Sequence, residues 1–279
     1  MFKIVDKQSL STSIAKFVIH APFVARKRQA GHFVIIRVDE TGERIPLTIV
    51  DSDLQQGTIT LIVQAVGKTT KLLNHKTQGD FLLDVVGPLG NPTPIEHVGT
   101  VVCIAGGVGT AEVYPIALAL KKAGNKVVTI VGAKSKELVI LEKELREFCD
   151  KVIITTEDGS LGTKGLVTDA LRSIMNSNGM INALYAIGPI QMMRAVAEFT
   201  RPLKIPTYVS LNPIMMDGTG MCGACRVTVG GEMKFACVDG PEFDGHLVDF
   251  EELIARNRTY SDLEKRSLEL FEAEVKESL

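Results

Sequence analysis

The sequence predicts an antiparallel β-barrel over residues 1–97, a doubly wound α/β sheet over 98–211, and a small cysteine-bearing segment over 212–279. The length of 279 residues matches two domains at about 150 residues each, with a short addition. Short strand-like runs fill the first part, whereas strands alternate with helices in the second. Three of the five cysteines fall within sixteen residues of the third part, which favours metal binding over disulfides.

The composition excludes several classes of protein. With 45% hydrophobic and 23% charged residues, the chain resembles an average globular protein, not a disordered or disulfide-scaffold one. The formal net charge of −2 offers no bulk attraction for nucleic acids or anionic membranes. Apolar stretches such as Val101–Ala105 are far shorter than the ~20 residues that span a bilayer. The first residues lack the apolar core of a signal peptide, so we expect a cytoplasmic protein.

The expected barrel strands are short runs rich in Val, Ile and Phe, separated by glycine-containing turns. They cover residues 13–21, 32–38, 44–50, 58–65 and 81–86. One helical piece is expected at Thr70–His75, and Pro92 and Pro94 mark the end of the barrel. Many short strands with one helical piece are typical of a small antiparallel barrel.

The second part begins with a continuous apolar run at 100–105, as expected for a parallel strand buried on both faces. Four more strands are expected at 126–132, 151–156, 183–188 and 206–211. The helices between them are expected at 112–123, 141–148, 168–175 and 190–200. Regular alternation of this kind predicts a doubly wound parallel sheet.

Two short strand-like runs follow at 225–229 and 232–237, and an acidic helical tail occupies 249–279. In this tail Leu268, Phe271, Val275 and Leu279 follow helical spacing. These four apolar side chains form one face of the helix, which packs either on its own chain or against a partner. The basic run at 26–28 is expected in a solvated loop.

A glycine turn, Gly106–Gly109, follows the first parallel strand and opens a helix. Such a turn lets the backbone approach a pyrophosphate at the positive end of the helix, although a tight turn without ligand is the alternative. A second turn, Ala186–Pro189, opens another helix of the same sheet, and two such turns define a dinucleotide crevice. Lys134 and Lys136 suit a 2′-phosphate and Glu157 suits a ribose hydroxyl, so NAD and NADP both stay open.

In the barrel, Arg44 precedes the hydroxyl of Thr48, and Gly67–Thr70 heads the helical piece. A guanidinium, hydroxyls and a helix start suit a pyrophosphate, whereas a solvated strand-edge charge is the alternative for Arg44.

The most specific motif is Asp217-x4-Cys222-x2-Cys225, followed after eleven intervening residues by Cys237. This is the spacing of plant-type 2Fe–2S ferredoxins, with an aspartate in the first position. Gly218, Gly220 and Gly223 allow the tight backbone that donates N–H groups to cluster sulfurs. A zinc site of three cysteines and one aspartate, or an incomplete site with a plain turn, are the alternatives. Cys103 and Cys149 are expected as inert core residues.

This order of parts resembles the ferredoxin–NADP reductase superfamily. Within it the chain is similar to the electron-transfer subunits of dihydroorotate dehydrogenase B, and more so to the small subunits of NADH-dependent reduced ferredoxin:NADP oxidoreductases. The matching segments are 44–49, 106–115, 185–189, 210–229 and 235–250. Two departures stand out: Arg44 lies four residues before Thr48, where the superfamily usually has three, and Leu47 replaces a common tyrosine.

The resemblance implies FAD in the barrel, NAD(H) on the sheet and a 2Fe–2S cluster in the last segment. The implied FAD contacts are Arg44, Pro46, Leu47, Thr48, Ile62, Val63, Gln64, Gly67, Thr69 and Thr70. The implied NAD(H) contacts are Gly106, Gly107, Gly109, Thr110, Gly188 and Pro189. The implied cluster ligands are Asp217, Cys222, Cys225 and Cys237. The aspartate separates the chain from four-cysteine dihydroorotate relatives and resembles the transhydrogenase-type subunit.

The function implied is electron transfer between NAD(H), FAD and the cluster. The implied partner is a larger subunit with its own FAD and 4Fe–4S clusters, in an electron-bifurcating heterodimer that exchanges electrons with ferredoxin. The alternatives are a dihydroorotate dehydrogenase B electron-transfer subunit and a zinc- and nucleotide-binding regulatory module without redox function. We assign no catalytic residue, because hydride transfer requires positioning and cofactor chemistry only.

Overall fold

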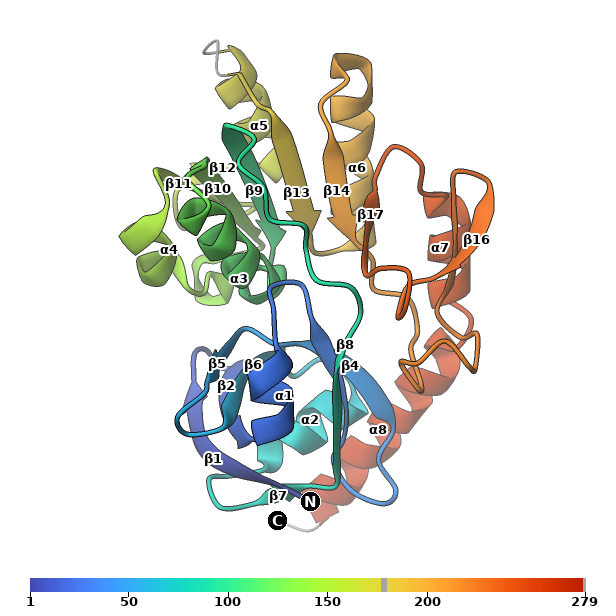
Figure 1. Ribbon diagram of the computed structural model, residues 1–279. Coiled ribbons are helices and arrows are strands. Elements are labelled where there is room, and N and C mark those ends of the chain that lie inside the picture. The colour runs from blue at the N-terminus through green and yellow to red at the C-terminus, as the bar shows by residue number, and fades with distance from the viewer. Residues whose placement is uncertain (177–179, 278–279) are drawn as a thin grey trace.

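The computed structural model describes residues 1–176 and 180–277. A β-barrel lies at one end and a helix-covered sheet at the other, while the C-terminal segment runs down one side of both (Figure 1). The polypeptide thus returns from the sheet to the barrel, so that segments distant in sequence share an interior. Among them, Ile35 of the barrel, Ile104 of the sheet, and Cys225 and Cys237 belong to one buried apolar cluster.

The barrel consists of antiparallel strands in two hydrogen-bonded groups, ordered β5-β6-β2-β1-β7 and β4-β3-β8. Their bounds are β1 Phe2–Ser9, β2 Ile14–His20, β3 Phe33–Arg37, β4 Arg44–Thr48, β5 Asp51–Asp53, β6 Thr58–Gln64, β7 Phe81–Leu82 and β8 Asp84–Leu89. Two helices accompany them, α1 Pro22–Lys27 and α2 Lys68–His75. Inward side chains such as Phe17, Ile19 and Leu61 are almost fully buried, which explains the alternating apolar pattern of β2 and β6.

Each of the five predicted runs contains strand, but β1 and α1 were not predicted. In β1 only Ile4 is buried, so the strand lacks an apolar alternation that a sequence pattern can reveal. The prediction of a solvated loop for the basic run is wrong: Arg26 and Lys27 are exposed but belong to α1, and the Arg28 side chain is bound to the barrel. Its guanidinium donates hydrogen bonds to the carbonyls of Ile49 and Val50, at 3.4 and 2.7 Å.

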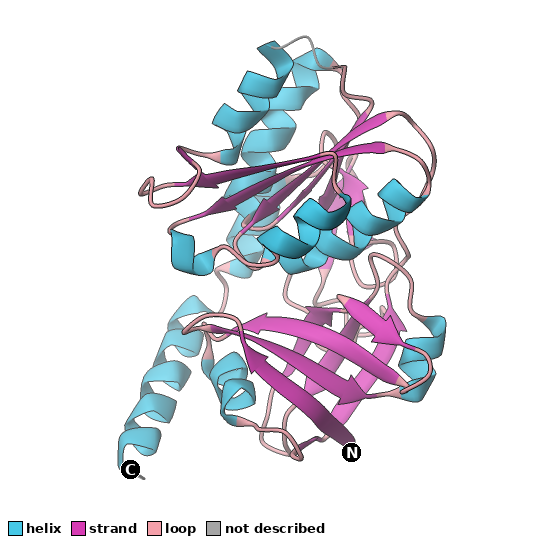
Figure 2. Ribbon diagram, turned by 90° about the vertical axis from the view of Figure 1, so that its left-hand side faces the viewer, coloured by secondary structure: helices cyan, strands magenta, loops and turns pink. Residues whose placement is uncertain are grey.

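The sheet has the strand order β12-β11-β10-β9-β13-β14-β17, parallel throughout except for β17. Its strands are β9 Thr100–Gly106, β10 Lys126–Ala133, β11 Lys151–Thr156, β12 Thr163–Lys164, β13 Ala183–Ile187, β14 Thr207–Ser210 and β17 Glu242–Asp244. The α-helices are α3 Gly109–Lys122, α4 Glu142–Phe148, α5 Val167–Asn176 and α6 Ile190–Thr200, with 3₁₀ turns at Lys136–Leu138 and Arg201–Leu203. Helices cover both faces of the sheet (Figure 2). The predicted doubly wound architecture is confirmed, and the strand order reverses between β9 and β13.

The C-terminal segment contains a hairpin of β15 (Arg226–Val229) and β16 (Glu232–Phe235), then helices α7 (Phe250–Asn257) and α8 (Ser261–Glu277). Between β16 and α7 the chain forms β17, which pairs antiparallel with β14 and so extends the seven-stranded sheet. The C-terminal segment is therefore joined to the sheet by backbone hydrogen bonds between β17 and β14. The exact boundaries at 97 and 211 stay predictions.

Helix α8 descends beside the barrel (Figure 1) and packs on α2. The Phe271 ring lies 5.8 Å from the His75 ring, and Lys71 forms an ion pair with Glu272. Phe271 thus faces its own chain, which supports the first of the two alternatives for the tail, and Leu279 lies outside the described residues. Within residues 1–176 and 180–277, no helix is long and apolar enough to span a membrane.

Candidate functional site

A cavity of about 700 Å³ opens at the carboxyl ends of the central parallel strands. Gly106, Gly107 and Gly109 from the β9–α3 turn line it together with Gly188 and Pro189, which follow β13. The two glycine turns predicted from the sequence therefore meet where the strand order reverses. This is the position at which open α/β sheets bind nucleotides.

The glycines of this turn have different physical roles. Gly107 has φ +58°, and nothing lies within 4 Å of the position that a Cβ would take, so its backbone is open to the cavity. A Cβ on Gly109, in contrast, would lie 2.5 Å from the carbonyl oxygen of Ile187. Gly107 therefore exposes the backbone to a ligand, whereas Gly109 allows α3 to approach the β13 turn closely.

Thr110 is completely buried and does not line this cavity. Its hydroxyl donates a 2.8 Å hydrogen bond to the carbonyl of Gly107 and so fixes the turn. Val108, at the N-cap of α3, has no side-chain hydrogen bond to the first helical N–H groups. The N–H groups of Thr110 and Ala111 instead donate to the carbonyls of Gly107 and Val108, at 3.2 and 2.9 Å. The positive end of the helix dipole still attracts an anion to this turn.

A second cavity of about 260 Å³ lies between the barrel and the C-terminal part of the chain. Seven predicted FAD contacts line it: Pro46, Leu47, Thr48, Ile62, Val63, Gln64 and Thr70. Asn212 and Met215, which the sequence did not single out, line it from the opposite side. Gln64, Glu112 and Asn212 line both cavities, so the two spaces meet.

Three of the predicted FAD contacts lie outside this cavity. Arg44 is exposed at the beginning of β4, Gly67 is the N-cap of α2, and Thr69 is buried. The Thr69 hydroxyl donates a 3.0 Å hydrogen bond to a Glu43 carboxylate oxygen. The roles of these three residues toward FAD stay predictions.

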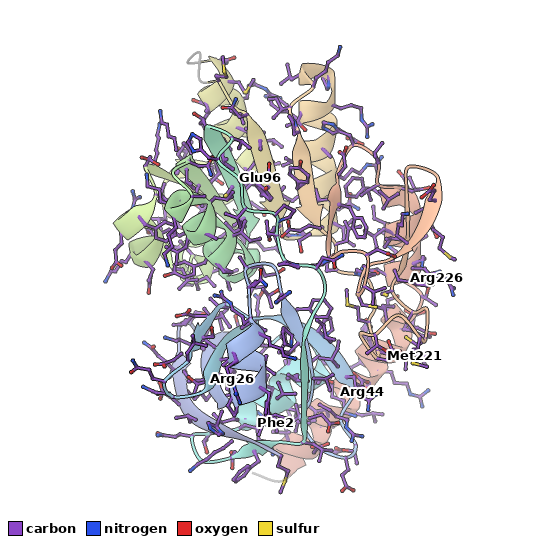
Figure 3. The ribbon with its side chains drawn as sticks, viewed as in Figure 1. Phe2, Arg26, Arg44, Glu96, Met221 and Arg226 are labelled. Atoms are coloured by element: carbon purple, nitrogen blue, oxygen red, sulfur yellow. The ribbon has the colours of Figure 1, made fainter. Side chains whose placement is uncertain are left out.

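The four predicted cluster ligands come together as two pairs. In the exposed pair, a carboxylate oxygen of Asp217 lies 3.3 Å from Cys222 Sγ. In the buried pair, Cys225 Sγ lies 3.2 Å from Cys237 Sγ, and both residues are 2% exposed. Figure 3 marks the surface of this segment with Met221 and Arg226, at the right of the molecule.

The two pairs differ in their electrostatics. The backbone N–H of Thr219 donates to the Asp217 carboxylate and is the main cause that lowers its pKa. Burial, followed by the hydrogen bond with Cys225, raises the pKa of Cys237 to about 12. The carboxylate is thus ready as an anionic ligand, whereas Cys237 loses its proton only when a cation offsets the cost of burial.

The donor set fits a two-iron cluster. Each iron of a 2Fe–2S centre needs two protein ligands, since bridging sulfides complete its shell. Across residues 1–176 and 180–277, no three His, Cys, Asp or Glu side chains converge on one ion position, as a mononuclear zinc site would require. A Cβ on Gly218 would lie 2.6 Å from Leu89 Cδ1 and 2.9 Å from Ile35 Cγ1, so the loop rests directly on the barrel.

Sequence reasoning did not identify Glu112, which follows the glycine turn by three residues. Its half-buried side chain lines both cavities and accepts a hydrogen bond from the Thr48 hydroxyl. Burial raises its pKa to about 7. A carboxyl group inside the first turn of a buried helix was the available signal.

Two parts of the chain match models of known protein families. Residues 1–93 match the oxidoreductase FAD-binding domain. Residues 212–249 match the iron–sulfur cluster binding domain of dihydroorotate dehydrogenase B.

Whole-chain relatives exist as well. The chain is 49% identical to the dihydroorotate dehydrogenase B (NAD(+)), electron transfer subunit homolog of Thermotoga maritima, over 96% of this chain and 95% of the relative. It is 38% identical to the dihydroorotate dehydrogenase B (NAD(+)), electron transfer subunit of Bacillus caldolyticus, over 79% and 86% of the two chains. A solved structure of an NADH-dependent reduced ferredoxin-NADP oxidoreductase, described with flavin-based electron bifurcation, shares 48% identity. It superposes with a TM-score of 0.92 over 97% of this chain and 98% of its own.

Proposed function

Because this chain belongs to the family of dihydroorotate dehydrogenase B electron-transfer subunits and their homologues, we propose that it passes electrons between NAD(H) and a larger partner subunit. The electrons travel by way of a bound FAD and a 2Fe–2S cluster. The chain is thus an oxidoreductase subunit, and its FAD-binding and iron–sulfur domains are the redox-active parts.

One observation supports this function most directly: three candidate cofactor sites adjoin one another. The nucleotide cavity meets the FAD cavity at Gln64 and Glu112. Met215 lines the FAD cavity only two residues before Asp217, the first predicted cluster ligand. Electron transfer requires such proximity, and a regulatory binding module does not.

When bound, FAD accepts hydride from NADH and releases electrons singly, and the cluster carries single electrons. The chain's own residues hold and orient these groups. The uncovered backbone at Gly107 and the positive N-terminal end of α3 bind the nucleotide pyrophosphate. Pro46, Leu47 and Thr48 form one wall of the FAD cavity and Asn212 and Met215 another, so they would hold the flavin between the barrel and the C-terminal part of the chain.

The partner in this proposal is a larger subunit with its own FAD and 4Fe–4S clusters, forming an electron-bifurcating heterodimer that exchanges electrons with ferredoxin. The NADH-dependent reduced ferredoxin-NADP oxidoreductase structure supports it, since the likeness covers nearly all of both chains. Asp217 in the first ligand position supports it too. We place the protein in the cytoplasm, because an odd number of cysteines, three of them clustered at metal-ligand spacing, is typical of a reducing compartment.

The second candidate is electron transfer to a dihydroorotate dehydrogenase catalytic subunit, which the match to its iron–sulfur domain favours. The two candidates differ in partner and in substrate. Co-purification from the native host, with mass spectrometry of the partner, separates them. A partner with flavin and 4Fe–4S clusters supports the first candidate, and a dihydroorotate-oxidising partner supports the second.

The visible spectrum of the purified complex tests the redox function itself. We expect flavin and 2Fe–2S absorption that NADH bleaches, with one FAD and two irons in this chain. Absence of flavin and iron, with one zinc per chain instead, would contradict electron transfer and support the regulatory module.

A further inference from the structure

Glu112 occupies the junction between the two cavities. It lies in the first turn of α3, lines the nucleotide cavity and the FAD cavity, and accepts a hydrogen bond from Thr48. Thr48, at the end of β4, lines the FAD cavity. A continuous polar path therefore leads from the FAD cavity through a hydroxyl and a carboxyl group to the larger cavity.

Glu112 is also distinctive in its chemistry. Among the described residues that line the smaller cavity, it alone has an ionisable side chain. The larger cavity adds Lys134 and Glu157, both exposed, and neither of them contributes to the pKa shift of Glu112. Burial raises this pKa, while the Thr48 hydroxyl favours the ionised form. A group that titrates near neutral pH can both accept and release a proton at similar rates.

The proposed function leaves one proton to be handled. Oxidation of NADH to NAD⁺ releases two electrons and one proton, which leave the nucleotide together as hydride. The iron–sulfur cluster accepts electrons only. For each NADH oxidised, one proton must therefore leave the FAD cavity while the two electrons pass on to the cluster and the partner.

We propose that Glu112 accepts this proton through the Thr48 hydroxyl and releases it to water in the larger cavity. The carboxylate becomes a neutral acid when it takes the proton and is restored when water takes the proton from it. In the reverse direction the same two residues supply the proton. This inference rests on the proposed function, because it concerns the proton that accompanies hydride.

The test uses the FAD- and cluster-loaded complex and the variant Glu112→Gln, which keeps the size and the hydrogen bond to Thr48 but cannot ionise. Stopped-flow absorbance separates flavin reduction by NADH from flavin reoxidation by ferricyanide, a one-electron acceptor. We expect reduction to change less than about threefold, and reoxidation to slow on the order of 10²-fold and to lose its pH dependence near pH 7. Glu112→Asp keeps a titratable group and should restore part of the reoxidation rate.

A second measurement does not depend on turnover. In the wild type, the slope of the bound FAD's reduction potential against pH should change near pH 7, and in Glu112→Gln this change should be absent. The matched control is Glu242→Gln. Burial raises the pKa of Glu242 to about 7 as well, but Glu242 lines neither cavity, so both readouts should match the wild type.

The outcomes separate this inference from the proposed function. If Glu112→Gln reoxidises as fast as the wild type with the same pH profile, or if both half-reactions slow equally, Glu112 is not the proton acceptor. If Glu242→Gln loses the same pH dependence, the inflection does not belong to the cavity. If the wild type binds no FAD or is not reduced by NADH, the proposed function fails first.

Discussion

Two glycine-rich loops are predicted to bind two different groups, and they are built in opposite ways. The turn at Gly106–Gly109 is confined by regular structure, with Gly109 against the Ile187 carbonyl and Thr110 bonded to the Gly107 carbonyl. The loop at 217–225 is the second part of the longer connection, residues 211–225, between β14 and β15. The Asp217 carboxylate holds this loop in place, because it accepts hydrogen bonds of 3.1 Å from the backbone N–H groups of Thr219 and Cys222.

The two loops also differ in how far their structure depends on the bound group. The nucleotide turn has its final shape without ligand, because strands and helices fix its backbone. The cysteine loop has one exposed donor in Cys222, one half-buried donor in Asp217 and two buried donors in Cys225 and Cys237, and burial raises the pKa of Cys237 to about 12. Because metal binding is generally coupled to the folding of the segment that holds the ligands, we expect the cysteine loop to depend on its cluster more than the glycine turn depends on its nucleotide.

The largest expected effect is in the cysteine loop. Asp217→Ala removes both a predicted iron ligand and the acceptor that orders the loop, so we expect loss of the cluster. Asp217→Cys should keep a 2Fe–2S cluster with an altered spectrum, because a thiolate is a softer and more covalent ligand than a carboxylate. Iron analysis and electron paramagnetic resonance of the reduced variants measure both effects. Full iron content and an unchanged signal in Asp217→Ala would show that Asp217 only shapes the turn.

The next prediction concerns Glu242 in β17, whose side chain is hydrogen-bonded to Thr93 in the segment between β8 and β9. The Thr93 hydroxyl donates to one of its oxygens at 2.5 Å, and the other oxygen has no partner among the described residues. Burial raises its pKa from 4.5 to about 7, so the folded state binds more protons than the unfolded state between these values. Stability therefore falls as pH rises through this window, by up to about 3 kcal/mol.

Glu242→Gln should abolish this loss. Relative to the wild type, the variant should gain up to about 3 kcal/mol in free energy of unfolding between pH 5 and pH 8. Urea unfolding at both pH values measures the difference, and parallel wild-type and variant profiles would contradict it. Such a gain would show that the buried carboxyl group of Glu242, and not the cysteine loop alone, lowers the stability of the cysteine-bearing segment.

A smaller effect is expected in the nucleotide turn. In Gly107→Val, a β-branched residue at φ +58° costs roughly 1–2 kcal/mol, and its side chain points into the nucleotide cavity. We expect the KM for NADH to rise about tenfold or more, with an intact cluster spectrum. Gly79→Val is a matched control, since Gly79 has φ +97° and open space but lies in a barrel turn outside both cavities. Equal KM values for the two variants would mean that the Gly107 turn is structural only.

The smallest effect is expected where α8 meets the barrel. The ion pair between Lys71 and Glu272 is partly exposed, with 33% and 45% of the two side chains accessible. Solvent screening limits such pairs to below about 1 kcal/mol. Lys71→Met should leave FAD occupancy and the cluster spectrum unchanged and lower the free energy of unfolding by less than this amount in urea titrations. A measurable loss of FAD would instead make α8 part of the FAD site.

Local patterns predicted much of this architecture. The continuous apolar run of β9 and the alternation in β2 and β6 report burial within single elements, so their strands were recognised. Helix α3 begins three residues before its predicted start, at Gly109, because glycines look like a turn even where they open a helix. Strand β17 was missed, since three residues carry no periodic pattern and its pairing with β14 depends on distant sequence.

The sequence by itself determined the order of the three parts, the two glycine turns and the ferredoxin-like spacing around Asp217. Only the tertiary structure decided that Arg28 is tied to two barrel carbonyls and that Phe271 packs on His75. It also placed Glu112 between two cavities. The physical reason is that periodicity and spacing are properties of neighbouring residues. The burial that raises the pKa of Glu112 comes instead from segments far apart in the chain, which meet only in the folded protein.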